Sequence, residues 1–203
     1  MKFKEFKKKM QKGIFSVEEA KRVAWNNSAQ TLRLQFHQWN TAGDLVRLKR
    51  GLYGFSDQIK DQVEIARALY TPAYISLESA LHHHGILPDV TFGLSLVTPR
   101  GTRSFKTPVG QFLYYQIKQN LFWGYDPKTL MAEPEKALLD YFYLKGVGLY
   151  PKIDFWETLR VQNLQELNFK KAKGYAKQFN IKKITELLLS LESYRHGKTK
   201  KPR

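Results

Sequence analysis

The apolar residues at the start of the chain recur every three or four positions, the spacing that places them on one face of an α-helix. In the first segment they are Phe3, Phe6 and Met10, and lysines occupy most of the other positions. This pattern predicts a basic amphipathic helix that ends at Gly13, since glycine readily adopts the left-handed conformation of a C-cap.

A second helix is predicted to begin at Ser16. Ser16 stands three residues before Glu19, which is the spacing of a capping box, in which each side chain bonds the backbone N–H of the other residue. Val17, Ala20 and Val23 continue the apolar stripe of this helix. The pattern then breaks at residues 26–28, so a turn is expected there.

A third helix is predicted from residue 29 to Gly43, with Asn27 or Ser28 as its N-cap. Its apolar face consists of Ala29, Leu32, Phe36 and Trp39. The opposite face carries amide, hydroxyl, imidazole and guanidinium groups and no acidic residue. Such groups can bind base edges and phosphates, so this face is the candidate surface for reading DNA.

The stretch that follows, residues 44–55, predicts two short strands around Arg50-Gly51. Three helices followed by a hairpin is the order of a winged helix–turn–helix. We expect base contacts from Ser28, Gln30, Thr31 and Arg33. We expect contacts with the DNA backbone from Lys21, Arg22, Asn27, His37, Gln38, Arg47, Lys49 and Arg50.

Charge strengthens this interpretation. The 203 residues carry a net charge of +16, and residues 1–55 hold 12 Lys/Arg against 4 Asp/Glu. Residues 164–203 hold 11 against 3. A basic field of this size attracts polyanions, so double-stranded DNA is the predicted partner.

The composition also narrows the class of protein. The chain has no cysteine, which excludes a disulfide framework and a thiolate metal site and fits a reducing compartment. No stretch approaches the ~20 apolar residues of a membrane span. The prediction is a cytoplasmic protein that does not bind a membrane.

The rest of the chain predicts a second domain. A connecting helix is expected at 57–69, a short helix from Ser76 to Gly85, strands at 91–98 and 110–118, and a helix that begins at Pro134. Lys136 and Asp140 are expected to pair on the surface of that last helix. The fold class is therefore α+β: a winged helix–turn–helix at 1–70, then an α+β domain at 71–203 with a mainly antiparallel sheet, a helical C-terminal part and a flexible basic tail at 195–203.

Two motifs of this domain resemble a known family. "YISLESALHHHGILPD" and "MAEPEKALLDYFYL" are similar to segments of the AbiEi antitoxins, transcriptional regulators of type IV toxin–antitoxin systems of abortive infection, and the resemblance covers about residues 16–145. Its motif residues are Ser79, His84, Gly85, Glu135, Lys136 and Asp140.

The resemblance implies a sequence-specific transcriptional regulator. It implies repression of the protein's own operon, through an operator upstream of that operon, and neutralisation of a nucleotidyltransferase-like toxin with which no stable complex is expected. From the residues themselves two alternatives stay open, because a winged helix can also dock another protein and a basic surface can bind RNA.

No catalytic activity, cofactor or metal is expected. The chain has no Gly-x-Ser-x-Gly elbow, and its "HGKT" at 196–199 lacks the earlier glycine of a phosphate-binding loop. His82, His83 and His84 are adjacent, and neighbouring helical residues point about 100° apart, so they cannot all face one ion.

Overall fold

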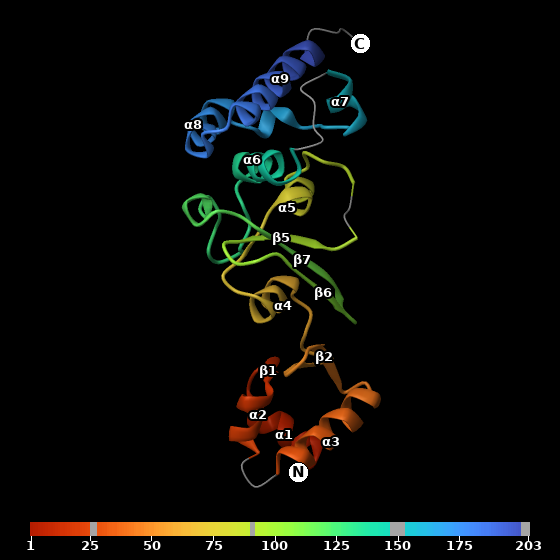
Figure 1. Cartoon of the computed structure of the whole chain (residues 1–203). Helices are drawn as coiled ribbons and strands as arrows, with labels where there is room; N and C mark the ends of the chain where they lie inside the picture. Colours follow the sequence, from red (N-terminus) through yellow and green to blue (C-terminus); the bar gives the residue numbers. More distant parts are fainter. Residues whose placement is uncertain (25–27, 90–91, 147–152, 200–203) are drawn as a thin grey trace. The chain divides into compact units, whose positions relative to one another are not determined.

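The computed structural model describes residues 1–24, 28–89, 92–146 and 153–199. The chain divides into two compact units: Met1–Thr71 with Phe105–Gln111, and Pro72–Ser104 with Phe112–Arg203. Within the described ranges there are nine α-helices and two small sheets (Figure 1). The predicted α+β class is therefore confirmed.

The first unit has four α-helices in the described ranges, and the first three lie where the apolar spacing placed them. They are α1 (Phe3–Met10), α2 (Val17–Val23), α3 (Ala29–Thr41) and α4 (Gln62–Leu69). The prediction that Gly13 caps α1 was wrong. Gln11 takes the left-handed conformation at the C-cap, with φ of 54°, and the carbonyl of Gly13 instead accepts a hydrogen bond from the backbone N–H of Phe55 at 2.9 Å.

The caps of α2 and α3 follow from their side chains. In α2 the capping box is confirmed: Ser16 Oγ accepts from Glu19 N at 3.1 Å and Ser16 N donates to Glu19 Oε2 at 2.8 Å. The Lys12 ammonium and the Ser16 N–H lower the pKa of Glu19 to about 2. Ser28 is the N-cap of α3, and Gly43 follows the helix with φ of 80°.

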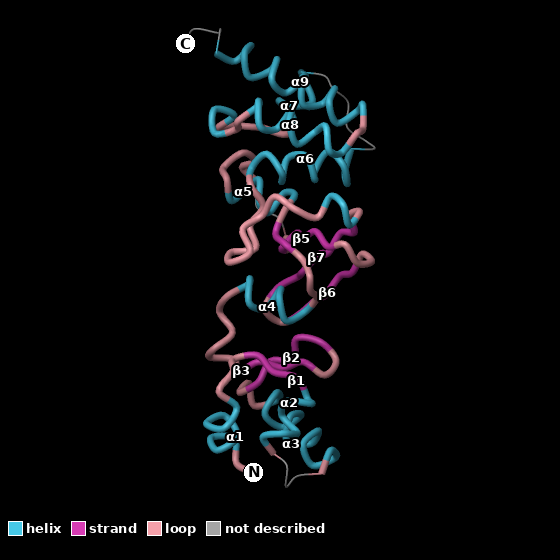
Figure 2. Tube along the Cα trace, turned by 90° about the vertical axis from the view of Figure 1, so that its left-hand side faces the viewer, coloured by secondary structure: helices cyan, strands magenta, loops and turns pink. Residues whose placement is uncertain are grey.

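The first sheet consists of β1 (Ile14–Ser16), β2 (Leu45–Lys49) and β3 (Leu52–Phe55), in the antiparallel order β1-β3-β2 (Figure 2). The predicted hairpin of β2 and β3 is confirmed, with its turn at Arg50-Gly51. Strand β1 was not predicted. With three residues it is too short to show the alternation of apolar and polar positions by which strands are recognised.

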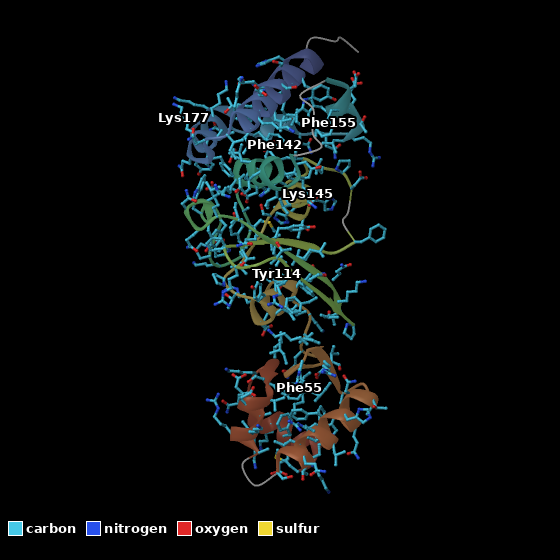
Figure 3. The ribbon with its side chains drawn as sticks, in the orientation of Figure 1. Phe55, Tyr114, Phe142, Lys145, Phe155 and Lys177 are labelled. Carbon is cyan, nitrogen blue, oxygen red and sulfur yellow. The ribbon has the colours of Figure 1, made fainter. Side chains whose placement is uncertain are left out.

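An aromatic core joins this sheet to α1, α2 and α3. Phe6 lies at its centre, with its ring centroid 5.4 Å from that of Phe15, 5.2 Å from Trp39 and 6.0 Å from Phe55. Phe55, labelled in Figure 3, is buried in this core. From α3 the core takes Leu32, Phe36 and Trp39, while the side chain of Ala29 lies outside the described part.

The second sheet has the order β4-β5-β7-β6. Its strands are β4 (Tyr74–Ile75), β5 (Leu94–Thr98), β6 (Arg103–Thr107) and β7 (Gly110–Gln116). It is mixed, because β5 pairs antiparallel with β4 but parallel with β7. The expectation of a mainly antiparallel sheet missed this pair. The two-residue turn between β6 and β7 reverses the chain, so β7 returns beside β5 in the same direction as β5.

Helices pack on the second sheet in successive layers. Helix α5 (Leu77–His83) packs on β5, α6 (Pro134–Lys145) packs on α5, and α8 (Phe169–Phe179) and α9 (Lys182–Thr199) pack on α6 (Figures 1 and 2). Helix α7 (Ile153–Thr158) lies against α9. The predicted tail is helical through residue 199, and its last four residues lie outside the described ranges. In the described ranges, no helix has both the length and the apolar character that crossing a bilayer demands.

Gly54 of β3 offers a test of the first unit's packing. A Cβ atom there would lie 2.5 Å from Ile59 Cγ2, closer than nonbonded carbons approach. We expect Gly54→Ala to lower the free energy of unfolding of this unit by about 1–3 kcal/mol through overpacking. The measurement is urea unfolding of the full chain, followed by NMR amide signals of the first unit.

Gly13→Ala is the matched control for this variant. Its Cβ would lie 3.5 Å from Gln58 Cβ, an ordinary contact, so its effect should stay within about 0.5 kcal/mol. Equal stability of the two variants would show that Ile59 moves aside without cost.

Candidate functional site

The exposed face of α3 is the first candidate surface. All six candidate DNA contacts on α3 and its N-cap that the structure describes are exposed: Ser28, Gln30, Thr31, Arg33, His37 and Gln38. They are exposed because the core takes the other side of the helix, where Leu32 and Phe36 each retain 1% of their accessible surface. The seventh, Asn27, lies outside the described residues.

Some of these side chains form hydrogen bonds within the protein, and others do not. Ser28 Oγ accepts from Thr31 N at 3.1 Å and lies 2.8 Å from Thr31 Oγ1, so both hydroxyls serve the N-cap. The side chains of Gln30, Arg33, His37 and Gln38 have no hydrogen-bond partner or ion pair in the part of the chain that is described. Their two amides, guanidinium and imidazole are therefore the groups left to bind something else.

The hairpin separates the two basic residues that were expected to act together. Strand β2 has a bulge at Leu48: Arg47 pairs with Tyr53, but Lys49 pairs with Leu52. Neighbouring residues of a strand point to opposite faces, and paired residues share a face. Arg47 therefore lies on the face of Tyr53, whose ring contacts Phe36 of α3 at 5.0 Å between centroids, and Lys49 lies on the other face.

Lys49 is used inside the first unit. Its ammonium donates to the carbonyl of Leu69 at 2.5 Å and lies 5.7 Å from the ring centroid of Phe105. Partial burial lowers the pKa of Lys49. The expected phosphate contact of Lys49 does not fit this placement, and the bulge in β2 is the physical reason.

Ion pairs divide the remaining cations of this unit into two groups. Lys7, Lys9 and Lys12 pair with Asp57, Glu5 and Glu19 at 2.5–2.8 Å. The second group has exposed side chains and no acidic partner in the described ranges; it includes Lys2, Lys4, Lys8, Lys21, Arg22, Arg33, Arg47 and Arg50. The positive charge available to a ligand therefore lies at the start of the chain and on α1 as well as on α2, α3 and the hairpin.

A second candidate lies in the other unit, where the motif residues Lys136 and Asp140 meet Tyr74 and Ser76. We call these four residues the buried charge cluster. Lys136 Nζ bonds Asp140 Oδ1 and donates to Tyr74 Oη at 2.8 Å. Tyr74 Oη and Ser76 Oγ each donate to Asp140 Oδ2 at 2.8 Å. Every side chain of the cluster is 0% exposed.

The surroundings of the cluster are apolar and aromatic. The Lys136 ammonium lies 5.3, 5.0 and 5.2 Å from the ring centroids of Tyr74, Trp123 and Phe179. Burial lowers the pKa of Lys136 and raises that of Asp140, and the attraction between them opposes both shifts. Gly124, with φ of 77°, has no room for a Cβ beside the Lys136 stem.

The expectation that Lys136 and Asp140 pair was correct, but their predicted place on the surface was wrong. The pair links β4, the N-cap of α5 and α6, and it has no access to solvent. A closed cluster in which each polar side chain has a hydrogen-bond partner fits a structural role. Sequence reasoning missed Tyr74 and Ser76, which lie 66 and 64 positions before Asp140. The apolar residues Ala137, Leu138, Leu139 and Phe142 do predict that α6 is largely buried, and the structure confirms this.

The other motif residues also join elements. Ser95 N donates to Ser79 Oγ at 2.9 Å, which ties α5 to β5, and His84 Nε2 lies 2.8 Å from the carbonyl of Ala132. Gly85 has φ of 69° after α5, and its carbonyl accepts from Asn163 Nδ2 at 2.9 Å. Glu135 Oε1 accepts from Asn168 N at 2.9 Å.

The histidine run does not converge on a common point. His82 Nδ1 lies 3.2 Å from the carbonyl of Leu87, whereas His84 bonds Ala132. Within the ranges described, no three His, Asp or Glu side chains gather in a way that could hold a metal ion.

Comparison with known proteins identifies no relative: no protein-family model matches the chain, and no curated protein sequence matches it.

The buried charge cluster gives a pH-dependent prediction. Lys136→Met leaves Asp140 buried without its cation, and we expect a loss of about 3–5 kcal/mol at neutral pH. Removing the ammonium raises the pKa of Asp140 further above its unfolded value of about 4. The folded variant then binds the proton more tightly than the unfolded chain, so its stability falls as pH rises above that value. The free-energy gap to wild type should widen from about pH 5 to about pH 8 in urea unfolding.

The double variant Lys136→Met/Asp140→Leu is the control. It removes both charges, so it should be more stable than Lys136→Met and nearly independent of pH in this range. A gap between Lys136→Met and wild type that does not change with pH would contradict an ionised Asp140 in the folded protein.

Proposed function

We propose that residues 1–70 form a winged helix–turn–helix domain that binds double-stranded DNA, with α3 in the major groove, and that the protein is a sequence-specific transcriptional regulator. The order α1, β1, α2, α3, β2, β3 and the sheet order β1-β3-β2 support this. In helix–turn–helix proteins the second helix of the motif enters the major groove; here that helix is α3.

One observation carries the proposal. The face of α3 that the core leaves outside is acid-free, and the side chains of Gln30, Arg33 and Gln38 have no hydrogen-bond or ion-pair partner in the described part of the chain. An α-helix with its side chains is about 10–12 Å across, which fits the major groove, about 12 Å wide. Glutamine can bind adenine and arginine can bind guanine through two hydrogen bonds.

The hairpin adds contacts beside α3. The side chain of Asn40 on α3 accepts a hydrogen bond from the backbone N–H of Arg47 at 3.1 Å. This bond holds β2 against α3 at Arg47, whose own side chain is exposed. Arg50 is exposed at the turn. With α3 in the groove, both guanidinium groups are placed to neutralise phosphates of the flanking backbone.

The biological role proposed for this activity is that of an antitoxin in a type IV toxin–antitoxin system that represses its own operon. The resemblance of the second unit's motifs to AbiEi antitoxins supports it, and fold-level analogy alone does not specify an activity. A nucleotidyltransferase-like reading frame next to the gene would favour the antitoxin over a solitary regulator.

Arg33 tests the orientation of α3. We expect the full-length protein to bind the DNA immediately upstream of its gene at least about a hundredfold more tightly than a scrambled duplex of equal length at physiological salt. Arg33→Ala should reduce this ratio by about 10-fold or more, because a bidentate base contact contributes about 1–3 kcal/mol of discrimination. Filter binding or fluorescence anisotropy measures both affinities. If Arg33→Ala keeps the full ratio, α3 does not lie in the groove with this face.

Arg47 tests the contact of the hairpin with phosphate. Arg47→Ala should weaken binding to both duplexes alike and lower the slope of log K against log salt by about one. Lys9→Ala removes the same charge from α1, where it is paired with Glu5 at 2.8 Å, and should leave the slope unchanged. Equal slopes for Arg47→Ala and wild type would place the hairpin away from the DNA.

A further inference from the structure

Leu34 is the exposed residue on α3 that the DNA-binding interpretation leaves unexplained. It retains 59% of its accessible surface, on a helix whose other apolar residues with described side chains are buried. Single exposed leucines are common on protein surfaces, and Leu189 on α9, 47% exposed, is one of them. Exposure alone therefore does not indicate a binding role for Leu34, but its position on α3 does.

That position is the centre of the outward face of α3. At about 100° per residue, Leu34 points away from the mean direction of the buried Leu32, Phe36 and Trp39. Its neighbours on the helix surface are the residues three and four positions away. These are Gln30, Thr31, His37 and Gln38, all exposed and all polar. An apolar side chain thus stands in the middle of a polar, acid-free surface.

The major groove offers few matches for such a side chain. Base edges there present hydrogen-bond donors and acceptors, and the C5-methyl group of thymine is the apolar exception. Leucine against a donor or acceptor would desolvate that group without replacing its hydrogen bond, which is unfavourable. Leucine against a methyl group buries apolar surface on both sides.

We propose that Leu34 is a specificity-determining residue that recognises the C5-methyl group of a thymine in the operator. The inference rests on the proposed function, since it assumes that α3 enters the major groove. It adds that one base pair of the site is selected as T·A over C·G by apolar contact, beside positions that Gln30 and Arg33 select by hydrogen bonds.

The experiment removes the methyl group and nothing else. In a synthetic duplex of the DNA upstream of the gene, each thymine is replaced in turn by deoxyuridine, and binding of the full-length protein is measured by fluorescence anisotropy. At one position, or at a symmetry-related pair, wild type should lose about fourfold in affinity per methyl group. Leu34→Ala should bind the unmodified duplex more weakly and lose nothing further at that position.

Two variants serve as controls. Leu189→Ala deletes the same atoms from an exposed helical leucine of the other unit and should keep the wild-type response. Arg33→Ala should bind more weakly but remain sensitive to deoxyuridine at the same position. Because Leu34 is exposed, Leu34→Ala should keep the thermal unfolding midpoint of wild type, which separates a lost contact from a lost fold.

The outcomes distinguish the two proposals. If the protein prefers the upstream duplex but no deoxyuridine position separates wild type from Leu34→Ala, the assignment of Leu34 is overturned while DNA recognition stands. If the upstream and scrambled duplexes bind equally, the proposed function fails and the inference fails with it. Full affinity of Leu34→Ala for the unmodified duplex also overturns the assignment and favours a protein partner for this face.

Discussion

The packing of α3 against the aromatic core of the first unit is the constraint on which the candidate interface depends. Phe36 and Trp39 lie 5.6 and 5.2 Å from Phe6 between ring centroids, and aromatic side chains contribute more buried area than any others. A rotation of α3 by one residue would expose these rings and bury Arg33 or His37, at the cost of both apolar burial and charge solvation. The packing of α3 on the aromatic core therefore fixes the orientation of its polar face. The side chains of that face need no hydrogen bonds within the protein to hold this orientation.

In the second unit, polar groups rather than aromatic rings fix the placement of a helix. The buried charge cluster pins α6 to β4 and to the start of α5 through Asp140, which accepts from Lys136, Tyr74 and Ser76. A buried ion pair adds little net stability compared with apolar residues of the same volume, and its geometry is more demanding. Its contribution is to disfavour other arrangements, since a shift of α6 by one residue would leave a charge without its partner. This explains why motif residues with ionisable side chains lie where no solvent reaches them.

Local sequence signals predicted much of the fold, and the misses share a cause. The capping box at Ser16, the third helix and the hairpin at Arg50-Gly51 follow from residues a few positions apart, and the structure confirms them. The misses depend on distant partners: β1 pairs with β3 far along the chain, and Asp140 meets Tyr74 across 66 positions. The bulge that turns Lys49 away from Arg47 arises from the pairing of β2 with β3, so the sequence of β2 alone does not predict it. At the candidate site, exposure of the α3 face was predictable, whereas the contacts of Lys49 and the exposure of Leu34 follow from the fold.

The exposed cations and the centre of α3 would contact DNA through different interactions, and this difference matters for the proposed function. Cations without acidic partners attract any polyanion, so they set affinity and its salt dependence without distinguishing one sequence from another. The centre of α3 carries Leu34 among polar side chains, and a leucine has no attraction for phosphate. A protein that served only as a general polyanion binder would gain from a lysine at position 34, which would also be better solvated. Under the proposed function, an exposed leucine there would weaken nonspecific binding and reward a matching base, so the face of α3 would supply discrimination and the exposed cations affinity.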